Sequence, residues 1–426
     1  MTDIPLFTTR RDFLVGGLKL LSAAATLPVF LGHTVRVLGA EPPTSQRHKT
    51  DSQRILVVVQ LAGGNDGLNT VVPYEYDQYY QFRPQIAIPK KDVLRLDQGV
   101  GLHPAATGLK ALYDAGHLAI LQGIGYPNAD RSHFVATDIW ESADPERHKH
   151  DGWLGRYFDA CCNGKEPAPE PIQGIALTQE APLALQGEKF MPVAFSNPDA
   201  LTWRAGQRDA QAAAVFGKLN NRGTDVPTTR PGEAQFLERA ALDALVGADE
   251  IRQAATSTLR GKRGGRGGPL AQQLGMVARM IKADLPTRVY YLSISGFDTH
   301  TGQLGRQQQL LKQLGDALED FMATLAEDKL LERVLVMTFS EFGRRVQENA
   351  SGGTDHGEAA PMFLIGAKLR PGLHGKHPDL ANLHRGDLAF ECDFRRVYAA
   401  VLQHWLGMQP DKVLGAGFGP VDVIKT

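Results

Sequence analysis

A short buried strand that runs into a glycine-rich turn constrains the fold of this chain more than any other feature. Residues 55–61 are almost all apolar and largely β-branched, which is typical of a strand buried on both faces of a parallel sheet. Gly63, Gly64 and Gly67 follow, and glycines allow a sharp turn and the close approach of a ligand. Asp66 therefore lies at the carboxyl end of a central strand, where open α/β sheets bind ligands. The alternative is a turn aspartate that bonds its own backbone.

Composition excludes several classes of protein. The chain has 426 residues, of which 42% are hydrophobic and 22% are charged, and its formal net charge is -1. This balance argues against a nucleic-acid partner and against an acidic disordered tail. Only three cysteines are present, two of them adjacent, and no Cys-x-x-Cys pattern occurs. We therefore expect neither a disulfide framework nor a cysteine zinc site.

The first forty residues resemble a twin-arginine export signal. Arg10 and Arg11 precede an apolar run over residues 15–32. Lys19 and two glycines interrupt that run, so we expect no permanent membrane span, although an N-terminal anchor is the alternative. The interpretation assigns residues 1–40 to the signal and 41–53 to a linker. It predicts a periplasmic or secreted protein that meets the twin-arginine export machinery.

Helices and strands alternate through the rest of the chain. Beyond residues 55–61, strands are predicted at 118–124, 288–295, 333–339 and 361–366, and helices at 105–116, 132–142, 303–325 and 393–406. This order predicts a single α/β domain over residues 54–426 with a mostly parallel central sheet. The less regular stretch 145–285 is interpreted as an insertion that caps the sheet edge.

Carboxylates and imidazoles follow several of the predicted strands. Because parallel strands bring their carboxyl ends to one edge, these side chains can meet although they are far apart in sequence. Carboxylates at close range repel one another, and a divalent cation would neutralise them. Any one of these residues alone is more often a cap or turn residue, but together they predict a site for Zn, Mn, Mg or Ca. The predicted ligands are Asp66, Asp298, His300, Glu341, Asp355 and His356.

A hydroxyl group lies at the start of a predicted helix beside the same edge. Ser132 follows Arg131 and precedes His133 at this helix start, a position that suits an anion or a nucleophile. We predict Ser132 as the nucleophile, Arg131 and His133 as catalytic neighbours, and Arg344 and Asn65 as substrate contacts. The alternatives are a plain serine cap and a histidine on the helix surface.

The motifs together resemble the DUF1501 family of bacterial proteins, over residues 50–410. That family is similar to the alkaline phosphatase and sulfatase superfamily, which implies a three-layer α/β/α sandwich with a two-metal site. The motifs that carry the resemblance are the twin-arginine start, Gly63–Thr70, Arg131–Phe134, Phe297–His300, Ser340–Arg344 and Thr354–Gly357.

The resemblance implies roles for four residues. Asp66 matches the metal ligand after the first strand, and Ser132 matches the nucleophile at a helix start. Asp298 matches the metal ligand after the third strand, and His356 matches the late histidine ligand.

Two departures from the superfamily pattern bear on the metals. His300 follows Asp298 by two residues, where the superfamily often has a histidine four residues on. Glu341-Phe342 stands where the superfamily often has Asp-His. A second metal would then be held by oxygens alone, from Asp66, Ser132 and Glu341. That ligand set favours Mg or Ca, or else leaves a one-metal site.

Three functions are compatible with these features. The first is an exported metal-dependent hydrolase of phosphate or sulfate esters, with Ser132 as nucleophile and an anionic ester as substrate. The second is a non-catalytic binding protein of the cell envelope on the same fold, which Glu341-Phe342 favours. The third is a phosphoryl or sulfuryl transferase, because an ester intermediate can pass to acceptors other than water.

Overall fold

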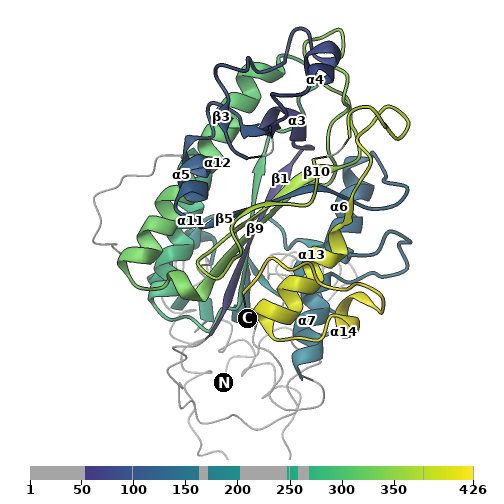
Figure 1. The fold of residues 1–426 in the computed structure, drawn as a ribbon. Coiled ribbons are helices and arrows are strands. Elements are labelled where there is room, and N and C mark those ends of the chain that lie inside the picture. The colour runs from purple at the N-terminus through teal and green to yellow at the C-terminus, as the bar shows by residue number, and fades with distance from the viewer. Residues whose placement is uncertain are drawn as a thin grey trace, which may run out of the picture. The chain divides into compact units, whose positions relative to one another are not determined.

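The chain divides into two compact units, one of residues 1–43 with 203–247 and one of residues 44–202 with 248–426. Every labelled helix and strand in Figure 1 belongs to the second unit. The predicted signal 1–40 and almost all of the linker lie outside the described residues. The computed structural model describes residues 53–97, 99–162, 171–201, 247–248, 250–257, 268–377 and 379–425.

A nine-stranded sheet forms the centre of the second unit. Its order is β11-β5-β10-β9-β1-β8-β6-β7, and β12 pairs with β5. Every pairing is parallel except those of β10, which is antiparallel to both β5 and β9. The strands are β1 (Ile55–Ala62), β5 (Leu118–Gly125), β6 (Gly174–Ala176), β7 (Val193–Ala194), β8 (Val289–Ser295), β9 (Val334–Phe339), β10 (Ala360–Ile365), β11 (Gly372–His374) and β12 (Cys392–Asp393).

The reversed strand β10 matters for the position of the site. All five predicted strands are present, and the mostly parallel sheet is confirmed. Because β10 runs against β9, its amino end lies at the edge where β1, β8 and β9 have their carboxyl ends. The connection from β9 to β10, residues 340–359, therefore begins and ends at that edge. Both of its ends are available to one site.

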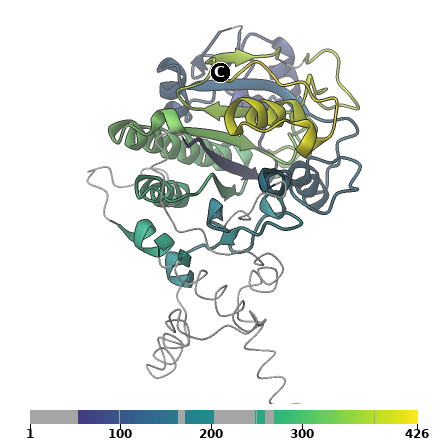
Figure 2. The ribbon, with the colours of Figure 1, turned by 90° about the horizontal axis from the view of Figure 1, so that it is seen from below.

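Helices cover both faces of the sheet, which confirms the three-layer sandwich (Figure 1, and from below in Figure 2). Alternate residues of β1 point to opposite faces: Val57 and Val59 pack in one hydrophobic cluster, and Leu56 and Val58 in another. The first cluster contains α5 (Thr107–Asp114), α11 (Gly268–Lys282) and α12 (Gln303–Glu327). The second contains α6 (His133–Ser142), α7 (Trp153–Cys162), α13 (Phe394–Ala400), the π-helix η5 (Val401–Leu406) and α14 (Asp411–Leu414).

Short elements complete the unit. The stretch 74–95, for which the sequence predicted no regular structure, contains a helix and a strand of a second, three-stranded sheet of order β2-β4-β3. None of the described helices is both long and apolar enough to cross a membrane. The short elements are α3 (Gly67–Thr70), α4 (Asp77–Phe82), β2 (Val71–Val72), β3 (Leu94–Arg95), β4 (Gly101–Leu102), η1 (Pro171–Gln173), η2 (Leu183–Leu185), η3 (Pro198–Leu201) and η4 (Leu331–Arg333).

Two glycines allow α5 to lie against α12. A methyl group added at Gly108 would overlap the main chain of Gly315, so the two backbones approach more closely than any larger residue permits. We predict that Gly108→Ala lowers the free energy of unfolding by about 1–3 kcal/mol through overpacking. Gly275→Ala in the middle of α11, where the new methyl meets only the tip of Arg279, should raise it by about 0.5–1 kcal/mol. Chemical denaturation measures both, and equal effects would contradict the close contact.

A buried carboxylate on α6 predicts a dependence of stability on pH. Glu141 accepts hydrogen bonds from the Tyr291 hydroxyl (2.6 Å) and the Ala184 amide (3.2 Å). Burial raises the pKa of Glu141 to about 6, although these hydrogen bonds oppose the rise. The raised pKa stabilises the fold at low pH, and that contribution is lost as pH rises through about 6.

We predict that wild type, relative to Glu141→Gln, loses about 2 kcal/mol of unfolding free energy between pH 4.5 and 7.5. Denaturation of both proteins at the two pH values measures the difference. A difference between the two proteins that does not change with pH would refute the role of Glu141.

Candidate functional site

One buried arginine joins the loops at the carboxyl edge of the sheet. Arg344 is 1% exposed, and its Nη2 pairs with Oδ1 of Asp298 at 2.6 Å. It also donates to four main-chain carbonyls, those of Gly63, Gly64, Phe297 and Thr354. The sequence predicted a substrate contact at Arg344. In the structure its guanidinium lies beneath the loops and connects them through these hydrogen bonds.

The two glycines after β1 are required by their close neighbours. Gly63 has a φ of +118° and Gly64 a φ of +79°, values that side chains rarely adopt. A methyl group at Gly63 would overlap the main chain at Asp298, and one at Gly64 would press into the Phe342 ring. The turn thus brings the end of β1 directly against the loops that follow β8 and β9.

Asp66 has partners of its own beneath this turn. It is 1% exposed, and its Oδ2 forms a 2.6 Å ion pair with buried Arg83 and accepts a hydrogen bond from Gln303. Its Oδ1 accepts the Leu68 amide (3.1 Å) and caps α3. With both oxygens engaged, Asp66 lies in a structural ion pair rather than among the predicted metal ligands. Sequence analysis missed Arg83 because it lies in a stretch without clear periodicity.

Asp298 is the carboxylate at the centre of the exposed cluster. It follows β8 and is 46% exposed, with Arg344 behind it. Partial burial disfavours its ionised form, but the hydrogen bond and positive charge of Arg344 outweigh this and lower the pKa to about 2. Asp298 is therefore ionised throughout the physiological range and presents a negative charge at the surface.

Three imidazoles surround Asp298, and each directs its Nε2 atom toward the carboxylate. Their Nε2 atoms lie near its carboxylate, at 3.5 Å for His133, 3.1 Å for His300 and 3.3 Å for His356. Each Nδ1 meets an acceptor: Glu341 for His133 (2.8 Å), Asp355 for His300 (3.1 Å) and the Arg131 carbonyl for His356 (2.7 Å). An acceptor at each Nδ1 favours the tautomer protonated there, and that tautomer leaves Nε2 a lone pair, as in histidines that bind metals.

The distance between two of these nitrogens tests whether a cation fits. Nε2 of His300 and Nε2 of His356 are 2.9 Å apart, and both are near Oδ1 of Asp298. Two lone pairs and a carboxylate oxygen repel one another at this range unless a proton or a metal ion lies between them. His133, Asp298 and His356 present one ligand atom each within 4.8 Å of one another. Imidazole and carboxylate groups in this arrangement fit a divalent metal ion.

Glu341 and Phe342 support these histidines. Glu341 is 2% exposed and accepts the Gly63 amide (2.8 Å) as well as Nδ1 of His133, so it orients an imidazole from behind. Phe342 stacks on His356 with 4.5 Å between ring centroids and lies 4.9 Å from the His133 ring. Glu341 and Phe342 thus lie directly behind the cluster and support two of its imidazoles. Sequence analysis had no signal for the contribution of Phe342.

Ser132 lies beside the cluster at the start of α6. It is exposed and occupies the N-cap position, but its side chain makes no capping hydrogen bond. Asp130 instead accepts the Ser132 amide at 2.7 Å. The Ser132 hydroxyl therefore has no hydrogen bond to any described residue. Arg131, one third exposed, pairs with Asp387 and lies 3.5 Å from Glu358.

Asn65 is held inside the loop. It is fully buried, its main-chain N–H donates to Ser340 Oγ (2.8 Å), and its side-chain Oδ1 accepts a hydrogen bond from the Thr70 hydroxyl (2.8 Å). Its Nδ2 has no hydrogen-bond partner among the described residues. The structure thus does not bring Asn65 to the surface beside Asp298, where the sequence predicted a substrate contact.

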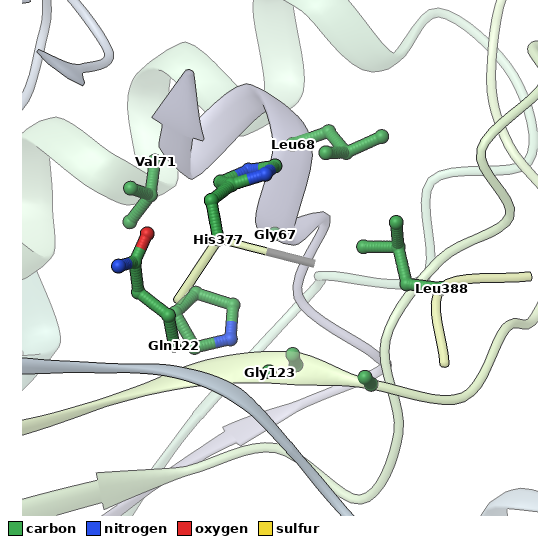
Figure 3. A pocket seen from close by; sticks show the side chains of 10 residues that line it. Gly67, Leu68, Val71, Gln122, Gly123, His377 and Leu388 are labelled. Atoms are coloured by element: carbon green, nitrogen blue, oxygen red, sulfur yellow. The ribbon is translucent and has the colours of Figure 1, made fainter. Parts of the chain in front are cut away.

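A separate pocket opens between α3, β5 and the start of β10 (Figure 3). It encloses about 270 Å³, including space open to solvent. Gln122 points into it, and Oε1 of this buried side chain has no hydrogen-bond partner among the described residues. None of the imidazoles around Asp298 lines this pocket, so it is distinct from the histidine cluster. Its lining is Gly67, Leu68, Val71, Gln122, Gly123, Ala359, Ala360, Pro361, His377 and Leu388.

Known proteins similar to this chain were found by family and by structure. Residues 119–413 match the model of the family described as "Protein of unknown function (DUF1501)". No curated protein matches the chain.

Three solved structures illustrate the structural likeness. The Zn complex of the C-terminal periplasmic domain of EcEptC from Escherichia coli is 8% identical, with a TM-score of 0.34 over 77% of this chain and 78% of that chain. The PsFucS1 sulfatase from Pseudoalteromonas sp. is 11% identical, with a TM-score of 0.36 over 87% and 71%. A protein in the alkaline phosphatase superfamily from Vibrio parahaemolyticus is 9% identical, with a TM-score of 0.34 over 82% and 71%.

The geometry predicts which variants lose a bound metal. His133→Ala and His356→Ala each remove an imidazole from the cluster, so both should bind zinc at least about tenfold more weakly than wild type. Asp66→Asn should bind zinc as wild type does, although it weakens the buried pair with Arg83 and lowers stability. Competition with a chromophoric chelator measures the affinities of the folded proteins. Loss of zinc in Asp66→Asn alone would return Asp66 to the ligand set.

Proposed function

The chain belongs to the DUF1501 family, and we propose that it is an exported, metal-dependent hydrolase of phosphate or sulfate esters. The observation that carries this proposal is the convergence of three imidazole Nε2 atoms on Asp298 beside the free hydroxyl of Ser132. Export is proposed from the twin-arginine pattern at Arg10 and Arg11. An anionic ester, small or polymeric, is the proposed substrate.

The metal would be held by His133, Asp298 and His356, with His300 as the neighbouring imidazole. Nitrogen donors outnumber the carboxylate in this set, which favours Zn²⁺ over Mg²⁺ or Ca²⁺. When bound, the ion supplies a Lewis acid that stabilises negative charge on the ester. Asp66 and Glu341 are left out of the proposed ligand set, since other partners already engage their carboxylates.

Ser132 supplies the proposed nucleophile. Its Oγ forms the bond to phosphorus or sulfur while the bond to the leaving oxygen breaks, and the hydroxyl proton passes to the leaving alkoxide. Water later cleaves the seryl ester and releases the inorganic anion. The amides in the first turn of α6 point toward Ser132 and favour an anion there. Arg131, one third exposed, lies one residue away, with its guanidinium paired to Asp387.

One observation favours a second function, metal binding without turnover. Of the two arginines predicted at the site, Arg344 is buried and engaged by main-chain carbonyls. Arg131 is paired with Asp387 and lies near Glu358. Neither therefore presents an uncompensated guanidinium to an anionic substrate. A non-catalytic envelope protein that binds a metal or a partner would have no need of one.

Replacement of the nucleophile separates the two functions. Ser132→Ala should reduce turnover of p-nitrophenyl phosphate or p-nitrophenyl sulfate by about a thousandfold or more, while zinc content and melting temperature stay unchanged. Ser351→Ala, in an exposed loop, is the matched control and should keep full turnover. Undiminished activity in Ser132→Ala would show that another group attacks the ester. Wild-type protein that binds zinc but hydrolyses neither ester, nor other phosphate and sulfate esters, would support the binding protein.

A further inference from the structure

A cluster of charged residues lies behind Arg131, outside the proposed ligand set. We call it the Arg131 cluster: Arg131, Arg345, Glu358, His384 and Asp387. Arg131 pairs with Asp387 and lies 3.5 Å from Glu358 Oε1, while Glu358 Oε2 meets His384 Nδ1 at 2.8 Å. Arg345 Nε lies 3.6 Å from the other oxygen of Asp387. The cluster thus ties the loop before α6 to the connection after β9 and to residues 384–387.

A tight turn supplies Asp387 to this cluster. His384 and Asp387 exchange two main-chain hydrogen bonds of 2.9 Å each. Arg385 and Gly386 between them have positive φ values of 54° and 84°, as in a type I′ turn. The turn defines the backbone position of Asp387 locally. Asp387 is therefore a fixed point to which the longer Arg131 side chain is drawn.

Asp387 needs a cation because it is fully buried. Its exposed fraction is 0%, and burial raises the pKa of its carboxyl group against the lowering effects of Arg131 and Arg345. Its Oδ1 has no hydrogen-bond partner among the described residues, so the pairing at Oδ2 with Arg131 is its main compensation. Removal of this partner would leave a buried carboxylate without compensation and would strongly lower the free energy of unfolding. The interaction therefore restrains Arg131 more firmly than a surface ion pair would.

The main chain of Arg131 in turn contacts the histidine cluster around Asp298. Its main-chain carbonyl accepts Nδ1 of His356 at 2.7 Å, the bond that directs Nε2 of that imidazole to Asp298. We propose that Asp387 and Glu358 are positioning residues for the metal centre, acting on His356 through Arg131. This inference rests on the metal site of the proposed function but not on ester hydrolysis.

A double-mutant cycle on zinc affinity tests the connection. If Asp387 acts through Arg131, Asp387→Asn and Arg131→Ala should each weaken zinc binding about tenfold, the lower end for a partner behind a ligand. The double variant should bind zinc no more weakly than either single variant, because both substitutions remove the same interaction between Arg131 and Asp387. Asp393→Asn is the control: it weakens a 2.6 Å ion pair with Arg395 at the start of α13, where both side chains are 16% exposed, and should keep wild-type zinc affinity.

Two further measurements separate positioning from general loss of structure. The visible absorption of bound Co²⁺ should change in Asp387→Asn and Arg131→Ala in the same way, since both free the same imidazole, and should not change in Asp393→Asn. Glu358→Gln provides a second entry to the cluster if Asp387→Asn fails to fold. It should weaken zinc binding in the same direction, because it removes a carboxylate beside Arg131.

The outcomes distinguish this inference from the proposed function. Zinc bound equally by wild type, Asp387→Asn and Arg131→Ala overturns the positioning role and leaves the metal site intact. Weaker binding in Asp387→Asn with unchanged binding in Arg131→Ala also overturns it, because the effect would then bypass Arg131. Wild-type protein that binds neither Zn²⁺ nor Co²⁺ overturns both the metal site and the positioning role. Equal weakening in the two single variants, without further loss in the double variant, supports the inference.

Discussion

The buried charge of Arg344 is the interaction on which the edge of this sheet depends. Its guanidinium bonds main-chain carbonyls from the turns after β1 and β8 and from the connection after β9. Carbonyls at the ends of strands would otherwise be buried without partners, which is costly. The remaining hydrogen-bonding capacity goes to Asp298, whose carboxylate is thereby ionised and oriented outward. One side chain thus satisfies the loops and sets the charge at the centre of the histidine cluster.

The sequence predicted the layers of the fold more fully than the details of the site. Strand-length apolar runs such as residues 55–61 and helical periodicity such as that of residues 303–325 report burial directly, so these elements were predicted. The direction of β10 could not be predicted, because a run of apolar residues predicts a buried strand but not whether it is parallel or antiparallel to its neighbours. Its reversal is what returns the β9–β10 connection, with Asp355 and His356, to the edge that carries Asp298.

The candidate ligands show where residue type alone is insufficient. Asp66 and Asp298 both follow a strand, and the difference between them lies in their partners. Arg83, more than a dozen residues along the chain, reaches back to Asp66, whereas Asp298 lies at the surface near three imidazoles. Similarly, Glu341 was expected to contact a metal and instead holds His133 from behind. The role of each carboxylate depends on which side chains contact it in the folded protein, and those contacts come from packing between segments that are distant in sequence.

The pairing of β1 has a consequence for the order in which the molecule forms. This strand comes near the start of the described chain, yet its two neighbours are residues 289–295 and 334–339. During synthesis β1 stays without either neighbour until most of the chain has been made, and pairing over such separations is slow. The histidines on the later loops have no common arrangement before that stage. An ion held by the proposed ligands would therefore bind late, after the central sheet has formed, and would stabilise only chains in which that sheet is complete.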